Sequence, residues 1–360
     1  MIIKTYNLYI IRNFLISLAN VSLIFFALIF ILNIFEEINF FKDQTSDILI
    51  PIFLTFLNIP SVIFDIFPFI FLITTQVFFL NLLDKDELNI FKNFGLNNFE
   101  IIKVLALTSF IISILLIVLF YNLSAKLKFK YLDLKNSFAN DNKYLAVVTE
   151  NGLWIKDEIN GLSNIVNAEQ IEGNFLKKVT ITQFSKDFKF IKSINSKSVD
   201  ITNKKWIIYD ASIFKDNLNT KIEKQLAFET NFDLEKINHL FSNLSSMTLF
   251  GLKKLKTDYR TLNYSTTEID LHSQKLYSYP LYLVIMTVLS AIIMLNIKHN
   301  NPRLFYLLGG ILVSVSIYYI NYFFGLLGKN QSLPIIFSAW MPLVILIILC
   351  LIGLVRINEK

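Results

Sequence analysis

The run from Phe14 to Phe35 decides the fold of this chain, and it reads FLISLANVSLIFFALIFILNIF. It holds no charged residue. A helix of about 20 residues crosses the roughly 30 Å hydrocarbon core of a bilayer, so this run is long enough to span it. A cleavable signal peptide has a shorter apolar region, followed by a small-residue cleavage site. We therefore expect a retained first membrane span.

Further apolar stretches predict five more spans. The second apolar region, from Ile48 to Leu83, is too long for one straight span, and it is interrupted by Pro51, Pro60, Asp65 and Pro68. We interpret residues 48–60 as a partly interfacial segment and about 62–83 as the second helix. The other predicted spans are Ile101–Leu123, Leu276–Ile297, Leu304–Leu327 and Leu333–Val355. Backbone groups within such stretches have only intrahelical partners, so each is expected to be helical.

The composition points the same way. Hydrophobic residues make up 54% of the 360 residues, charged residues make up 17%, and the mean hydropathy is +0.52. The net charge of +6 comes almost entirely from an excess of Lys, and no basic cluster with interleaved aromatic residues indicates a nucleic-acid partner. Cys350 is the sole cysteine, which excludes a disulfide within the chain. These features favour a membrane protein that does not bind nucleic acid.

Basic residues in the short loops lie mostly on one side of the predicted spans. That side holds nine, namely Lys4, Arg12, Lys85, Lys92, Lys103, Lys298, Arg303, Arg356 and Lys360. The other side holds Lys42 and Lys329, with the acidic residues Glu36, Glu37, Asp43 and Asp47 beside Lys42. Short loops rich in Lys and Arg remain in the cytoplasm. We therefore expect both termini to be cytoplasmic, which agrees with an even number of spans.

The long polar region between the third and fourth spans is then expected outside the cytoplasm, and its pattern is β-like. Short runs rich in β-branched and aromatic residues occupy 144–149, 153–156, 179–184, 188–194 and 206–209, with turns at Asn151-Gly152 and Asn160-Gly161. Such spacing predicts an antiparallel sandwich or open barrel. The stretch 232–267 has a more helical pattern. The predicted fold class is a membrane α-helical protein of six transmembrane helices with an inserted all-β extracytoplasmic domain.

We expect the chain to divide into residues 1–123 with the first three spans, the insertion at 124–275, and residues 276–360 with the last three spans. No catalytic motif is found in any of them. A phosphate-binding loop needs Gly-x-x-x-x-Gly-Lys-Ser/Thr, and the nearest approach, Gly325 to Asn330, has Asn after Gly328-Lys329. His239, His272 and His299 are too scattered to predict a metal site. We expect no enzymatic activity and no cofactor in this chain.

Two features remain as candidates for function. Asp65 is a lone carboxylate in an apolar run, and it fits either a structural role near the headgroups or proton coupling. The loop at about 84–98 has Leu88 and Phe91 on one face, to which Leu83 and Phe94 can also contribute. It has acidic residues at its start and Gly95 as a terminator. It is either an amphipathic helix on the lipid surface or a coupling helix that docks on a cytoplasmic protein. Its mixed charges favour the second reading, because interfacial anchors carry more Lys and Arg.

The chain resembles the LptF/LptG permease family of the lipopolysaccharide-export ABC transporter, and is more similar to LptG. The resemblance rests on Glu87 and Gly95 in the loop above, on Thr149–Asp157, on Lys275–Leu281, and on Leu333-Pro334 with Ala339–Pro342. It covers nearly the whole chain and implies that the β insertion is jellyroll-like. One departure is the outer end of the first span. Family members tend to be basic there, whereas this chain has Asn33, Glu36 and Glu37, with only Lys42 nearby.

The resemblance implies a permease subunit that extracts lipopolysaccharide from the inner membrane of a bacterium and passes it to a periplasmic bridge. The implied partners are an LptB-like cytoplasmic ATPase, an LptF-like sister permease and LptC- or LptA-like jellyroll proteins. Glu87, Leu88, Phe91 and Gly95 are expected to couple to the ATPase, and Asn33, Glu36, Glu37 and Lys42 to lie at a lipid gate. The alternatives are a secondary transporter driven by protons through Asp65, or a mechanotransmitting ABC subunit.

Overall fold

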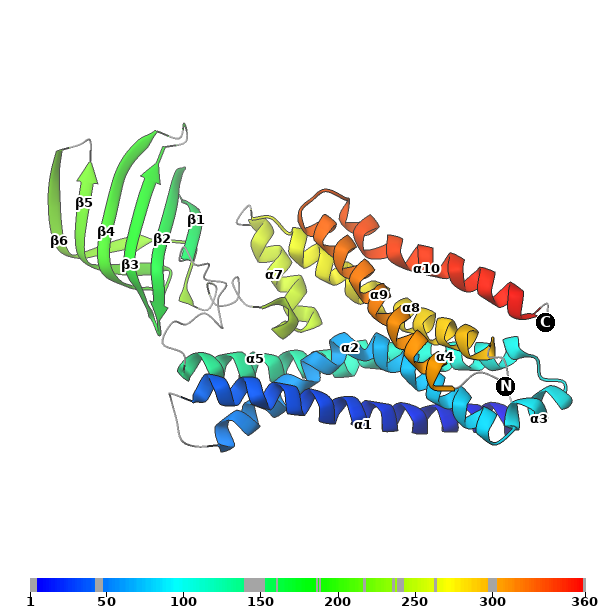
Figure 1. The fold of residues 1–360 in the computed structure, drawn as a ribbon. Helices are drawn as coiled ribbons and strands as arrows, with labels where there is room; N and C mark the ends of the chain where they lie inside the picture. Colours follow the sequence, from blue (N-terminus) through cyan, green and yellow to red (C-terminus); the bar gives the residue numbers. More distant parts are fainter. Residues whose placement is uncertain are drawn as a thin grey trace. The chain divides into compact units, whose positions relative to one another are not determined.

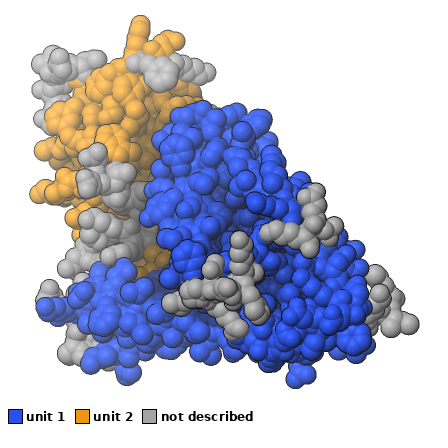
Figure 2. Space-filling view, turned by 45° about the vertical axis from the view of Figure 1, so that its right-hand side comes forward, with its two compact units in different colours: residues 1–127, 267–360 blue, residues 128–266 orange. Residues whose placement is uncertain are grey.

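The computed structural model divides the chain into two compact units. Unit 1 comprises residues 1–127 and 267–360, and unit 2 comprises residues 128–266; Figure 2 colours them separately. The residues that the structure describes are 5–42, 48–138, 153–159, 161–185, 187, 189–215, 218–234, 237, 243–261, 264–296 and 303–358. The helical unit is therefore assembled from both ends of the chain, with unit 2 as an insertion between its third and fourth long helices.

Six helices among the described residues are long and apolar enough to cross a membrane, as the sequence predicts. In chain order these spans are Thr5–Phe41, Leu49–Asp84, Asn98–Lys135, Thr267–Leu295, Phe305–Lys329 and Ile335–Ile357. They correspond to α1 (Thr5–Phe41), α2 (Leu49–Asp84), α4 with its continuation (from Asn98), α8 (Thr267–Leu295), α9 (Arg303–Lys329) and α10 (Ile335–Asn358), shown in Figure 1.

The expected break in the second apolar region is wrong. Helix α2 runs without interruption from Leu49 to Asp84, with Pro60 and Pro68 inside it. Proline lacks an N–H and leaves the carbonyl four residues earlier without its helical partner. For Pro68 that carbonyl belongs to Phe64, and the Tyr279 hydroxyl of α8 donates a hydrogen bond of 2.6 Å to it. A tertiary hydrogen bond thus replaces the missing helical one, as membrane helices with internal proline require.

The third span is longer than the stretch that the sequence predicts. Helix α4 (Asn98–Leu115) passes into a π-helical turn, η1 (Leu116–Tyr121), and then into α5 (Asn122–Phe138). The predicted end at Leu123 lies inside this continuous helical segment. A π-helical turn inserts an extra residue into the helical repeat, and such turns are frequent at functional positions. Here the turn ends at Tyr121, whose side chain is buried.

Helices α2 and α8 form the centre of the bundle. In each of them 61% of the most apolar window is buried, against 17% for α1 and for α9. Polar side chains connect α8 to its neighbours: the Ser290 hydroxyl donates to the Leu72 carbonyl at 2.7 Å, and the Thr287 and Ser109 hydroxyls lie 2.9 Å apart. Because lipid chains give no hydrophobic drive for helices to associate, small polar contacts of this kind hold a membrane bundle together.

Unit 2 contains a six-stranded antiparallel sheet in which each strand pairs with the next along the chain. Its strands are β1 (Leu153–Ile159), β2 (Leu162–Glu172), β3 (Phe175–Phe184), β4 (Phe190–Asp200), β5 (Lys205–Lys215) and β6 (Leu218–Glu229). This sheet confirms the prediction of an all-β insertion. After β6 come the turn η2 (Leu244–Ser246) and helix α7 (Leu249–Thr261), in the stretch where the sequence has a more helical pattern.

Four of the five predicted strands overlap with β1, β3, β4 and β5, and the fifth, at 144–149, lies outside the described residues. Strands β2 and β6 are not among the predicted ones. The apolar residues of β2 and β3 line one face of the sheet, with Val166, Ile181 and Leu176 all buried. Trp206 of β5 is also fully buried, and its indole N–H donates to the Phe232 carbonyl at 2.9 Å. This bond attaches the segment after β6 to the core of the sheet.

Candidate functional site

The loop between α2 and α4 contains a short helix, α3 (Glu87–Asn93). Its end has a defined geometry. Gly95 has a φ of 79°, its N–H donates to the Lys92 carbonyl at 2.9 Å, and the Leu96 N–H donates to the Phe91 carbonyl at 3.0 Å. This pair of bonds is the Schellman arrangement that terminates helices at a glycine. A side chain at position 95 would be strained by the positive φ, so the sequence requires glycine there.

Two tyrosines at the start of α1 hold this loop. The Tyr9 hydroxyl donates to Glu87 Oε1 at 2.7 Å, and the Tyr9 ring packs edge-on against Phe91 with their centroids 6.2 Å apart. The Tyr6 hydroxyl donates to Glu100 Oε2 at 3.0 Å, in the first turn of α4. The first turns of α1 therefore contact the loop on both sides of α3. No sequence pattern links residues so far apart, so neither tyrosine is predicted from the sequence.

The predicted coupling residues therefore contact their own chain. Glu87 and Phe91 meet Tyr9, and Leu88 is buried. The apolar surface that α3 presents outward comes instead from Ile90, which is 47% exposed, and Phe94, which is 82% exposed. Because they are four residues apart, Ile90 and Phe94 lie next to each other and form an exposed apolar surface on α3.

A polar cluster surrounds Asp65 at the far end of α2 from α3. The carboxylate of Asp65 interacts electrostatically with Lys275 and Tyr279 of α8 and with Tyr121 of η1. Asp65 precedes Asp84 by 19 residues, which is about 28 Å along a helix, and Lys275 precedes Leu295 by a similar distance. The two charges therefore sit at the same level, about one hydrocarbon thickness from the α3 end.

Further contacts tie this cluster to three other helical segments. The Tyr121 hydroxyl lies 2.9 Å from His272 Nε2, and the Phe64 and Tyr279 rings are stacked at 4.6 Å. Lys275 reaches Gly325 of α9 so closely that a Cβ there would lie 2.7 Å from Nζ. Asp65 is itself exposed, and its electrostatic interaction with Lys275 favours a structural role for the carboxylate. Proton coupling through Asp65 stays a prediction.

Two motifs that carry the family resemblance lie close together beside this cluster. The indole N–H of Trp340, in the segment Ala339–Pro342, donates to Gln274 Oε1 at 3.0 Å. Gln274 directly precedes the segment Lys275–Leu281. Within that segment, Lys275 interacts with Asp65 and Tyr279 binds the Phe64 carbonyl. The structure therefore gives these residues specific packing roles between α2, α8 and α10.

The candidate lipid-gate residues occupy different environments at the end of α1. The Asn33 amide donates to the Ile29 carbonyl at 3.0 Å, and Asn33 Oδ1 accepts from the Asn58 amide of α2 at 2.7 Å. Glu37 is buried, whereas Glu36 and Lys42 are exposed. Asp43 and Asp47 lie outside the described residues. The structure brings Asn33 to α2 and leaves only Glu36 and Lys42 of this group available at the surface.

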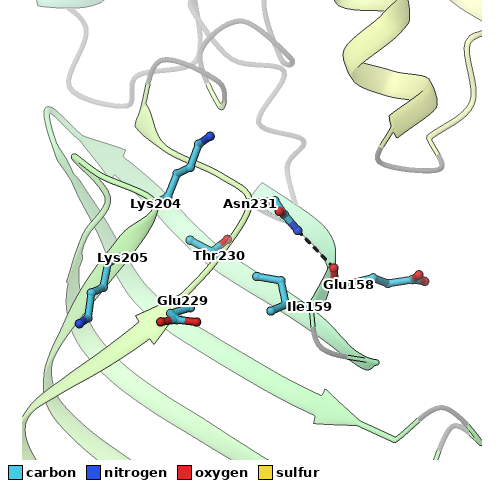
Figure 3. A pocket seen from close by; sticks show the side chains of 7 residues that line it. All are labelled: Glu158, Ile159, Lys204, Lys205, Glu229, Thr230 and Asn231. Carbon is cyan, nitrogen blue, oxygen red and sulfur yellow. Dashed lines mark hydrogen bonds between the residues drawn. The ribbon is translucent and has the colours of Figure 1, made fainter.

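Asp157 joins the end of β1 to the segment that follows β6. Asp157 is 1% exposed, and it accepts from the Thr230 hydroxyl at 2.7 Å, the Asn231 amide side chain at 2.7 Å and the Asn231 backbone N–H at 3.1 Å. Beside this seam lies an open hollow of about 540 Å³. Figure 3 shows its lining side chains, which carry both charges: Glu158, Ile159, Lys204, Lys205, Glu229, Thr230 and Asn231.

The described residues show no group of His, Cys, Asp or Glu that could hold a metal ion. His272 contacts Tyr121, while His239 and His299 lie outside the described residues. Gly325, Gly328 and Lys329 belong to helix α9 and therefore form no phosphate-binding loop.

Comparison with known proteins identifies the family. A search of curated proteins found no match. A family model described as lipopolysaccharide export system permease LptF/LptG matches residues 8–356, which is nearly the whole chain. The model covers both members of the pair, so the greater likeness to LptG stays a prediction. With six spans and an inserted sheet in agreement, the chain belongs to the LptF/LptG family of lipopolysaccharide export permeases.

Proposed function

We propose that this chain is one of two permease subunits of an ABC transporter that extracts lipopolysaccharide from the inner membrane. Membership of the family supports the substrate class and the inner-membrane location. In this proposal both termini are cytoplasmic and the sheet of unit 2 is periplasmic, where it passes the lipid to jellyroll proteins of a bridge. The energy comes from a cytoplasmic ATPase partner.

The observation that carries the proposal is the geometry of α3. A seven-residue helix is too short to be stable in water by itself. Here Tyr9, buried Leu88 and the Gly95 turn hold it in place. A segment fixed so firmly to the bundle can transmit the movement of a bound partner to the spans.

We propose that Ile90 and Phe94 are the apolar anchors for the ATPase, because they are the exposed apolar side chains of this segment. Leu88 and Phe91 then hold α3 in place through their contacts within the chain. Glu87 has the Tyr9 hydroxyl as an internal partner, so its contribution to ATPase binding is expected to act through the position of α3. Aromatic anchors at the centre of an interface typically contribute about 2 kcal/mol or more to binding.

The sheet offers two edges for a partner strand, and one of them is partly occupied. The Tyr264 hydroxyl accepts from the backbone N–H of Lys156 in β1 at 2.9 Å and lies 3.2 Å from the Lys156 carbonyl. The Asn231 amide donates to the carbonyl of Glu158 at 3.2 Å. Strand addition needs open backbone groups at an edge. We therefore propose that the bridge pairs with β6, at the opposite edge of the sheet.

Phe94→Asp is expected to weaken ATPase binding by about 30-fold, because the change removes an anchor worth about 2 kcal/mol and adds a charge to an apolar contact. The position is 82% exposed and caps α3 with an ordinary backbone conformation, so the permease itself should fold normally. Co-purification of the full-length chain with its native ATPase, together with ATPase activity of the complex, measures the effect.

The matched control is Asn93→Asp, which adds the same charge at the neighbouring exposed position and keeps the phenylalanine. It should leave association nearly unchanged. Normal association and normal ATPase coupling in Phe94→Asp would refute the docking role of α3. Solute transport by the purified chain alone in vesicles would refute the dependence on an ATPase.

A further inference from the structure

Helix α7 has an exposed aromatic residue that its own unit leaves uncovered. Leu252 and Leu255 on one side of the helix are buried. Phe250, on the other side, is 85% exposed, which is the highest value of any large apolar side chain that the structure describes. Phe250 thus gives the outward face of α7 a large apolar side chain.

Two lysines flank this phenylalanine on the same face. Lys253 and Lys254 follow Phe250 by three and four residues, a spacing that places side chains next to each other on a helix. Both are exposed, as is Arg260 two turns further on. Within the part of the chain that the structure describes, no carboxylate lies within ion-pair distance of Lys253 or Lys254. The face is therefore apolar at one end and has Lys253 and Lys254 beside the phenylalanine, with one carboxylate, that of the half-buried Asp258, one turn beyond Lys254.

The orientation of α7 is fixed within unit 2. The rings of Tyr259, near the end of α7, and Tyr264 pack 5.7 Å apart, and the Tyr264 hydroxyl binds the backbone of Lys156 in β1. Burial raises the pKa of Tyr264 to about 12, so its hydroxyl stays protonated at any physiological pH. These contacts hold the inner side of α7 against its own unit and leave the face of Phe250 and Lys253 outward.

The same combination recurs where the chain leaves the bundle. In α5, the exposed Phe129 lies between Lys126 and Lys130, which are also exposed. Helix α5 continues the third span directly, and α7 ends five residues before α8 begins the fourth. Five extended residues reach at most about 18 Å, so α7 ends close to a membrane crossing. Both Phe–Lys groups thus adjoin the two crossings that flank the insertion.

We propose that α7 docks on the anionic lipid surface of the leaflet that faces unit 2. Phe250 inserts among the headgroups, and Lys253 and Lys254 bind lipid phosphates. An exposed aromatic residue with adjacent lysines on an amphipathic helix is what such a surface binds, and each basic residue near an anionic surface strengthens the attraction. Docking holds the β1 end of the sheet beside the membrane. This inference rests on the membrane spans and not on the proposed coupling to an ATPase.

The test places a photoreactive benzoylphenylalanine at position 250 of the full-length chain. The chain is reconstituted in nanodiscs of phosphatidylcholine alone, or of phosphatidylcholine with a minor fraction of phosphatidylglycerol. After illumination, mass spectrometry measures the yield of lipid crosslinked at position 250. We expect phospholipid adducts, with a yield about tenfold higher in the anionic nanodiscs. The double substitution Lys253→Ser/Lys254→Ser should abolish that increase.

The matched control is Lys204→Ser/Lys205→Ser, which removes two exposed lysines of the sheet and changes the net charge equally. This variant should keep the full increase. Three results would each overturn the proposal: equal yields in neutral and anionic nanodiscs, an increase that survives the loss of Lys253 and Lys254, or adducts only with protein. Adducts with a second copy would instead identify this face as a protein contact.

Discussion

Asp65→Asn is expected to lower both the yield of folded permease and the delivery of lipopolysaccharide to the cell surface, and Lys275→Met is expected to do the same. Each change leaves the opposite charge without its partner near the membrane boundary. An unpaired charge is unfavourable by about 3 kcal/mol at the centre of a bilayer and by less toward its surface. The double substitution removes both charges, so it should restore much of both quantities.

The double variant separates the two interpretations of Asp65. If the carboxylate carries protons, Asp65→Asn/Lys275→Met stays inactive even when it folds. If the pair is structural, the double variant recovers, and the coupling between the two sites appears as a non-additive effect. The measurements are size-exclusion profiles of the full-length chain in mild detergent and lipopolysaccharide at the surface of cells that depend on this chain.

An exposed ion pair between α8 and α9 provides the matched control. Glu268 and Lys329 lie 2.8 Å apart, and each side chain is more than half exposed. Exposed pairs contribute at most about 1 kcal/mol. Glu268→Gln should therefore change neither measurement. An equally large effect of Glu268→Gln would show that the bundle responds to the loss of any charge at this end. The prediction of a specific role for Asp65 would then be wrong.

Asp157→Asn is expected to open the seam between β1 and the segment after β6. The carboxylate accepts three hydrogen bonds with both of its oxygens. Asparagine keeps one acceptor oxygen and directs an NH₂ group toward a donor of Thr230 or Asn231. Hydrogen bonds to a charged acceptor contribute about 1.5–3 kcal/mol each, so a loss of about 3 kcal/mol in local stability is expected.

Hydrogen exchange measured by mass spectrometry on the full-length chain tests this prediction. Peptides that cover β1 and the end of β6 should exchange on the order of a hundredfold faster, which corresponds to about 3 kcal/mol. The neighbouring exposed carboxylate provides the control: Glu158→Gln removes an ion pair with Lys156 at the surface and should leave exchange unchanged. Equal protection in Asp157→Asn and the native chain would contradict a role for Asp157 in closing the sheet.

The sequence predicted the six spans well because uncharged apolar runs of this length have one stable solution in a membrane. The prediction from sequence was wrong where a tertiary contact compensates for a residue that usually interrupts a helix. Pro60 and Pro68 indicate a helix break, yet α2 is continuous because the Tyr279 hydroxyl replaces the hydrogen bond that Pro68 cannot make. That partner lies more than 200 positions away along the chain, so no local pattern identifies it.

In the sheet, β2 and β6 were not predicted, because they have too many polar residues to show the alternation of apolar and polar side chains that indicates a strand. Strand β2 contains Asn164, and its side chain is buried and accepts from the Gln183 amide of β3 at 2.7 Å. In the sequence alone, polar residues such as these indicate a loop. The exposure of the residues in α3 could not be predicted from the sequence either, because the half-buried Phe91 packs against Tyr9, which is far away along the chain. Sequence periodicity can identify the apolar residues of a helix, but the fold determines which of them other parts of the chain cover.

The contacts of Tyr6 and Tyr9 have a mechanical consequence for α1. This helix of 37 residues is about 55 Å long, and it is among the least buried of the six spans. A displacement of α3 must either break the Tyr9–Glu87 hydrogen bond or pull the beginning of α1 with it, and a displacement of the start of α4 acts in the same way through Tyr6 and Glu100. Because an α-helix is stiff along its axis, a pull at Tyr9 arrives at Glu36 and Glu37, on the opposite side of the bilayer. A movement of α3 can thus be transmitted to the acidic end of α1.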